Sequence, residues 1–86
     1  MSNLYKIQVN TVDKVKRFSG RIIGIDSEAM MRTEDRKYCV DAKSIMGIFS
    51  LDLTKNLILE INGDEKQFIK DIGNMGIYIE PISTGV

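Results

Sequence analysis

Two hydrophobic periods follow each other at the start of the chain, and their order strongly constrains the fold. Tyr5, Ile7 and Val9 alternate with polar residues, which is the two-residue period of a strand with one buried face. A helical stripe with spacings of three and four comes next, and it consists of Val12, Val15, Phe18, Ile22 and Ile25. A strand followed directly by such a helix indicates a mixed domain of sheet and helices.

The same two periods continue along the chain and predict five further elements. Residues 28–33 and 37–42 are typical of a hairpin with a polar tip, and residues 57–61 alternate as another strand. Residues 44–51 and 64–72 have the features of a short helix and of a helix with an acidic first turn. The simplest way to bury these faces is an α+β fold, in which three helices cover one face of a four-stranded, mainly antiparallel sheet.

The ends of the predicted helices depend on single residues. Asp13 is the expected N-cap of the first helix, and Gly20 and Gly24 weaken the C-terminal half of that helix. Gly73 and Gly76 are expected to end the third helix.

The segment after the third helix leaves two structures open. Pro81 excludes a continuing helix. Ile77 and Ile79 either form an edge strand or pack directly on the sheet.

Composition excludes several classes of function. The 86 residues suffice for one domain, and 12 basic and 12 acidic residues cancel, so nothing favours a nucleic-acid or membrane surface. The chain has no histidine, which disfavours zinc binding and histidine acid–base catalysis, and we expect no metal and no cofactor. Cys39 is the single cysteine, so we expect a cytoplasmic protein in which this thiol is a half-buried hydrophobic residue.

The stretch AKSIMGIFSL, residues 42–51, resembles the regulatory-serine signature of the HPr family. These are the small phosphocarrier proteins of the bacterial phosphoenolpyruvate-dependent sugar phosphotransferase system. The order of the predicted elements extends the resemblance over residues 4 to about 72, although the N-terminal half resembles the family only in pattern. The resemblance implies an HPr-like open-faced β-sandwich. It also implies a single domain over residues 1–86, with an uncertain tail from about residue 77.

The resemblance also implies a set of functional residues. In the family, the serine that matches Ser44 is phosphorylated by HPr kinase/phosphorylase, and the residues around it bind that kinase, the catabolite-control repressor and Enzyme I. Ser44 is therefore the expected phosphorylation site. The expected partner-binding residues are Lys43, Ile45, Met46, Gly47 and Phe49.

The position of Ser44 at a predicted helix start allows two interpretations. A phosphate there would be stabilised by unpaired backbone N–H groups, and it would add about two negative charges beside an apolar surface. Alternatively, Ser44 only caps the helix, as serine very often does. The neighbouring signature favours the regulatory interpretation.

The chain departs from the family at the phosphocarrier histidine. An ungapped count back from Ser44 places Asp13 at that position, within the stretch TVDKVKRF, and the surrounding motif is absent. Asp13 is expected to cap the helix. The alternative is that its carboxylate accepts phosphate as an acyl phosphate.

The sequence therefore predicts a regulatory binding module that is not an enzyme. A retained serine signature without the histidine resembles the family's catabolite-repression paralogue in outline. Phosphotransfer through Asp13 and a self-associating structural module stay open as alternatives, and the oligomeric state is not determined by the sequence.

Overall fold

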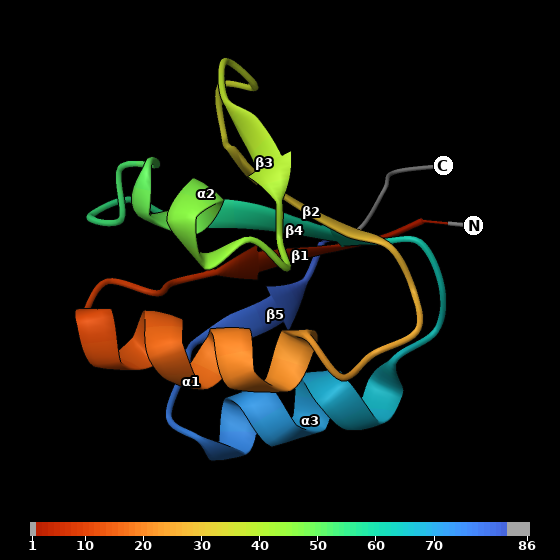
Figure 1. Ribbon diagram of the computed structural model, residues 1–86. Helices are drawn as coiled ribbons and strands as arrows, with labels where there is room; N and C mark the ends of the chain where they lie inside the picture. The colour runs from red at the N-terminus through yellow and green to blue at the C-terminus, as the bar shows by residue number, and fades with distance from the viewer. Residues whose placement is uncertain (1, 83–86) are drawn as a thin grey trace.

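The computed structural model describes residues 2–82 as one five-stranded sheet and three helices (Figure 1). Residues 83–86, the end of the tail whose structure the sequence left uncertain, lie outside the described part. In chain order the elements are β1 (Asn3–Ile7), α1 (Val12–Ile22), β2 (Ala29–Thr33), β3 (Cys39–Asp41), α2 (Ile45–Phe49), β4 (Leu57–Ile61), α3 (Lys66–Asn74) and β5 (Ile79–Pro81).

The sheet has the strand order β3-β2-β4-β1-β5, and every neighbouring pair is antiparallel. The predicted α+β fold is therefore confirmed, whereas the predicted number of four strands is wrong. The fifth strand forms because the free edge of β1 pairs with the segment after α3, with Ile7 opposite Ile79. Ile77, two residues earlier, is buried in the core. Both structures left open for this segment thus occur together.

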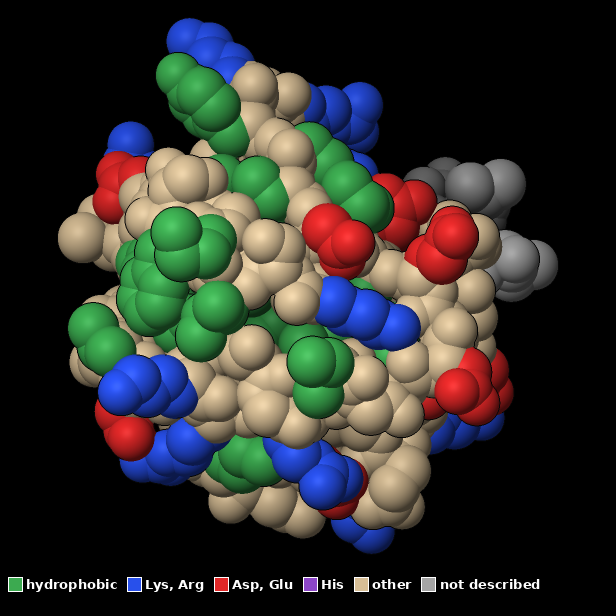
Figure 2. Space-filling view, in the orientation of Figure 1, with side chains coloured by type: hydrophobic (Ala, Val, Ile, Leu, Met, Phe, Trp, Pro, Cys, Tyr) green, Lys and Arg blue, Asp and Glu red, His purple; other side chains and the backbone are tan. Residues whose placement is uncertain are grey.

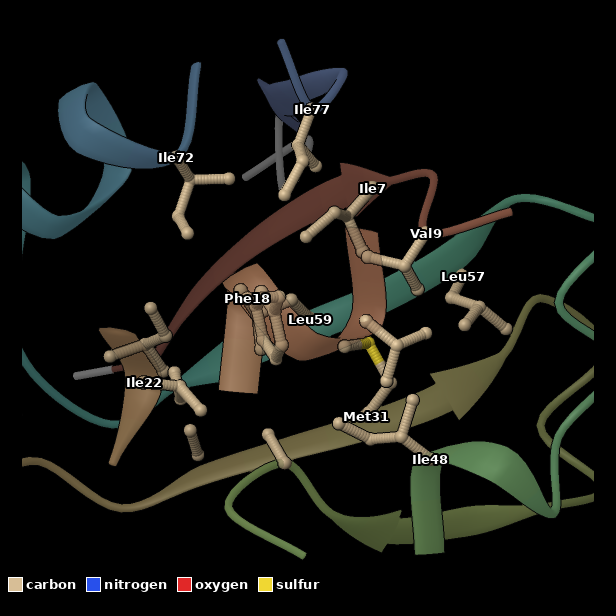
Figure 3. Close-up of a cluster of buried hydrophobic side chains, with 14 of the residues drawn as sticks. Ile7, Val9, Phe18, Ile22, Met31, Ile48, Leu57, Leu59, Ile72 and Ile77 are labelled. Carbon is tan, nitrogen blue, oxygen red and sulfur yellow. The ribbon is translucent and has the colours of Figure 1, made fainter. Parts of the chain in front are cut away.

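One hydrophobic core lies between the sheet and the helices (Figure 3). Alternation along β4 turns Leu57, Leu59 and Ile61 toward the helices and buries them completely. All three helices contribute buried side chains to this core: Val15, Phe18 and Ile22 from α1, Ile48 from α2, and Phe68 and Ile72 from α3. The Phe18 and Phe68 rings meet edge to face, with centroids 5.9 Å apart. Among residues 2–82, no helix covers the opposite face of the sheet (Figure 1).

The start of α1 differs from the expectation. Thr11 is the N-cap, because its backbone is extended and its hydroxyl accepts a hydrogen bond from the Lys14 N–H at 3.1 Å. Asp13 is the second residue of the helix, so the predicted capping role of Asp13 is wrong. The helix ends at Ile22, and Ile25 packs partly against the core from the following loop.

The other two helices also end differently from the prediction. The helix after Ser44 stops at Phe49, and Leu51 is buried just beyond it. Gly73 lies inside α3, so its predicted role as a stop is wrong. Gly76 follows the helix with φ of 81°, a left-handed conformation that favours glycine.

The hairpin of β2 and β3 forms as predicted, with one correction. Val40 packs partly against the core, and Ala42, just after β3, is buried. Cys39 alternates with Val40 and is exposed, so the prediction of a half-buried thiol is wrong. No helix among residues 2–82 has the length and apolar character needed to cross a membrane.

Candidate functional site

The candidate site is built on α2, which begins directly after Ser44. Ser44 is the N-cap of this helix: its backbone is extended, and its hydroxyl accepts a hydrogen bond from the Gly47 N–H at 3.1 Å. Serine provides this cap because its short side chain can reach the unpaired N–H groups of the first turn. The Ser44 side chain is exposed, so its hydroxyl is accessible from solvent.

One side of α2 is fixed to the rest of the molecule. Ile48 is completely buried beneath the helix, and Leu51 is nearly so. Gly47 faces β3 at close range, since a Cβ at this position would lie 3.0 Å from the Val40 Cβ. Ile48 and Gly47 therefore fix how α2 packs against the rest of the protein: Ile48 is buried beneath the helix, and Gly47 allows its close contact with β3.

The other side of α2 forms an exposed apolar surface, which we call the α2 patch and define as Ile45, Met46 and Phe49. Their exposed fractions are 36%, 80% and 40%. Figure 2 shows apolar side chains gathered over α2, with basic side chains beside them over the first turns of α1. This segment thus has a buried side with Ile48 and Leu51 and an exposed side with the α2 patch.

Lys43 has a structural role at the start of α2. Its Nζ donates a hydrogen bond to the Ile25 carbonyl at 2.7 Å, and its backbone N–H donates to Asp41 Oδ1 at 2.9 Å. Lys43 thus links the loop before β2 to the segment that precedes α2. Lys43 is partly buried and its ammonium group is already bonded, and its predicted role in partner binding stays a prediction.

Asp13 lies in the first turn of α1 and is exposed. Its carboxylate pairs with the Arg17 guanidinium four residues along the helix. Arg17 also donates a hydrogen bond to the Met75 carbonyl at 2.8 Å, which connects this pair to the end of α3. A negative side chain is favourable in a first helical turn, so Asp13 has a structural role independent of phosphate chemistry.

Two further exposed apolar residues were not anticipated by the helical pattern. Val12 was predicted to belong to the buried stripe, but it is the first residue of α1 and is exposed. Ile23 follows the last residue of the helix and is also exposed. Identification of Thr11 as the cap would have placed Val12 at the first position of the helix.

A hollow of about 570 Å³ lies beyond the end of α2, between the hairpin tip and the loop before β4. Hydrogen bonds from Thr33 and the Lys37 N–H lower the pKa of Asp35, and hydrogen bonds from Thr54 lower the pKa of Asp52. Both carboxylates are therefore held in local turns. Within residues 2–82, no group of three or more acidic, cysteine or histidine side chains is placed to hold a metal ion.

Comparisons of the chain with models of protein families, with curated proteins and with solved structures found no match.

Proposed function

We propose that this protein is an HPr-like regulatory binding module without histidine phosphocarrier activity. It docks protein partners through the α2 patch, and phosphorylation of Ser44 is the switch. The observation that carries the proposal is the position of the exposed Ser44 hydroxyl directly before Ile45 and Met46, on a helix anchored by buried Ile48. The surface that contacts a partner and the serine that would carry the phosphate thus both belong to α2 and its N-cap.

The sequence and the fold support the proposal in different ways. The signature of residues 42–51 is the specific part of the resemblance. The first seven elements follow the order that the resemblance predicts, and β5 is an addition to it. The α2 patch supports a docking role, because contiguous exposed apolar side chains often mark a protein-interaction surface.

A phosphate on Ser44 would act on the patch through its charge. It would lie next to the first N–H groups of α2, where a negative group is favourable, so the helix should persist. A partner that binds Met46 in the unphosphorylated protein would then also contact the phosphate, which carries about two negative charges. The fold need not repack for the choice of partner to change.

The proposed setting is sugar phosphotransferase and carbon catabolite control in the bacterial cytoplasm. The proposed partners are HPr kinase/phosphorylase and the catabolite-control repressor, with Enzyme I as a further partner. Phosphotransfer through Asp13 has less support, since the Arg17 guanidinium already binds its carboxylate.

The test is phosphorylation in vitro with ATP and a bacterial HPr kinase/phosphorylase, followed by intact mass. We expect one added phosphate on the natural protein and none on Ser44→Ala. Ser50→Ala is the matched control, because Ser50 ends the same helix and its Oγ donates to the Gly47 carbonyl. The Ser50 variant should be phosphorylated like the natural protein.

Two outcomes contradict the proposal. One is the absence of any phosphate, and the other is phosphate that persists in Ser44→Ala. Phosphoenolpyruvate with Enzyme I tests the Asp13 alternative, for which a hydroxylamine-sensitive label absent from Asp13→Ala is the expected sign. Sedimentation over a concentration series tests self-association, and a dimer disrupted by Met46→Ser would favour the structural alternative.

A further inference from the structure

The face of the sheet opposite the helices carries a second surface, which combines apolar and charged side chains. Ile58 of β4 points to this side, because its neighbours Leu57 and Leu59 are buried in the core. In the strand register, Lys6 lies directly opposite Ile58 on β1, and Arg32 lies opposite Ile58 on β2. One row across the sheet thus places an isoleucine between two cations.

A hollow of about 530 Å³ opens on this face, within the size range of small-molecule sites. Its apolar lining includes Leu4, Ile58 and Ile82. These side chains come from β1, β4 and the residue after β5, and the Ile82 N–H donates to the Leu4 carbonyl at 2.9 Å. The apolar side chains of the hollow therefore project from backbone segments that are hydrogen-bonded to one another.

The charged lining of the same hollow consists of three basic and two acidic side chains, and the charge of Arg32 is balanced by its ion pair with Glu60. Lys6, Arg32 and Arg36 face it together with Glu34 and Glu80. Lys6 and Arg36 form no ion pair within residues 2–82. Lys6 also lies directly opposite Glu80 in the register, yet these two side chains are not paired.

Other interactions involve some of the charged side chains of the hollow. Glu80 interacts with Tyr78, and this interaction raises the pKa of the Tyr78 phenol. Arg32 Nη1 donates to Glu60 Oε1 at 3.0 Å, but the buried Arg32 Nε has no acceptor within residues 2–82. Arg32 is therefore already engaged with Glu60, and its buried Nε is not accessible to a ligand in the hollow.

We propose that this hollow binds a small molecule with an anionic head, a carboxylate or a phosphate monoester, on a short apolar chain. The head would lie beside Lys6 and Arg36, the two basic side chains of the lining that form no ion pair within residues 2–82. The chain would cover Leu4 and Ile82. This site lies on the face opposite the helices and does not depend on phosphorylation of Ser44.

The experiment is a titration of the ¹⁵N-labelled full chain, followed by amide chemical shifts. Octanoate and octyl phosphate are the two probes, and they distinguish a carboxylate head from a phosphate head. We expect saturable shifts for amides of β1 and β4 around Lys6 and Ile58, with little change in α2. Octanol and inorganic phosphate, which each lack one half of the proposed chemistry, should bind much more weakly.

Charge variants separate this site from general ion binding. Lys6→Gln should weaken octanoate binding about two- to fivefold, the range expected for loss of one partly exposed charge contact. Arg36→Asn provides a second test in the turn, where Arg36 has φ of 64° and asparagine tolerates that backbone. Lys16→Gln on α1 is the matched control and should bind like the natural protein.

Three results would overturn the proposal. Octanol or inorganic phosphate could match octanoate, which would make the head or the chain irrelevant. Lys16→Gln could weaken binding as much as Lys6→Gln and Arg36→Asn. The amide shifts could instead fall on α2 and α1, which would locate the ligand on the other side of the molecule.

Discussion

Gly47 approaches Val40 so closely that a Cβ added to the glycine would lie 3.0 Å from the Val40 Cβ. The same atom would lie 3.3 Å from the Ser44 Oγ, which is the group that caps α2. This contact joins the candidate site to the edge of the sheet. It also explains a glycine in a helix of only five residues, where alanine has the higher helix propensity.

Gly47→Ala should therefore destabilise the protein by about 1–3 kcal/mol, because the added methyl group overpacks the contact with β3. Gly20→Ala is the matched control, since a Cβ there meets no atom within 4 Å. It should stabilise the protein by up to about 1 kcal/mol. Urea denaturation of both variants measures the difference, and equal effects would contradict the close approach of α2 to Val40.

Thr11→Ala should lower the free energy of unfolding by about 1 kcal/mol, because the variant loses the hydroxyl that caps α1. Thr11→Ser keeps the hydroxyl and should retain most of the stability. Asp13→Ala removes an exposed pair with Arg17 and a favourable negative charge in the first turn, so its effect should shrink in about 1 M salt. A larger, salt-independent loss for Asp13→Ala than for Thr11→Ala would restore Asp13 as the cap.

Ile48→Ala should cost about 2–5 kcal/mol, because it leaves a cavity beneath α2 at a side chain that is fully buried. Met46→Ala lies two residues away on the exposed side and should change stability by about 0.5 kcal/mol at most. Thermal unfolding of both variants tests the division of the helix. Comparable losses would mean that Met46 is also part of the core.

Asp71 should make stability depend on acid pH. A hydrogen bond from Gln67, reinforced by Arg21, lowers its pKa below 3.8 in the folded state. Its contribution is therefore fully present above the unfolded-state pKa, and it is lost as pH falls through the folded-state pKa. Asp71→Asn should flatten the loss of stability below about pH 4.

The carboxyl chemical shift of Asp71 measures the same effect directly. Gln67→Ala should raise the Asp71 pKa toward its ordinary value, because the variant loses the main hydrogen bond to the carboxylate. An Asp71 pKa that does not move in this variant would show that Gln67 is not the cause.

Elements with a clear hydrophobic period could be predicted from the sequence. In β4, the alternation of Leu57, Leu59 and Ile61 matches their complete burial. In α2, Ile48 is buried and Met46 is exposed, in keeping with their separation by about half a helical turn. These patterns lie within short stretches of sequence, and the residues that they mark as apolar are the ones buried in the core.

Features that depend on a distant partner could not be predicted in this way. Ile79–Pro81 is too short to have a period of its own, and it becomes a strand because β1 offers unpaired backbone groups. Thr11 and Asp13 are both good N-cap residues, and only the backbone conformation distinguishes them. The hollow beside Lys6 joins residues from both ends of the described chain, which no local pattern contains.

The position of β1 between β4 and β5 has a consequence for how the chain folds. Ile7 pairs with Leu57 on one side and with Ile79 on the other, so an early strand is completed only by late segments. Such distant pairings must close long loops, which slows folding relative to a helical bundle of the same length. During synthesis, β1 precedes both of its partners, so its native pairing must await β4 and then β5. An unpaired strand edge in that interval can pair with another copy of the chain.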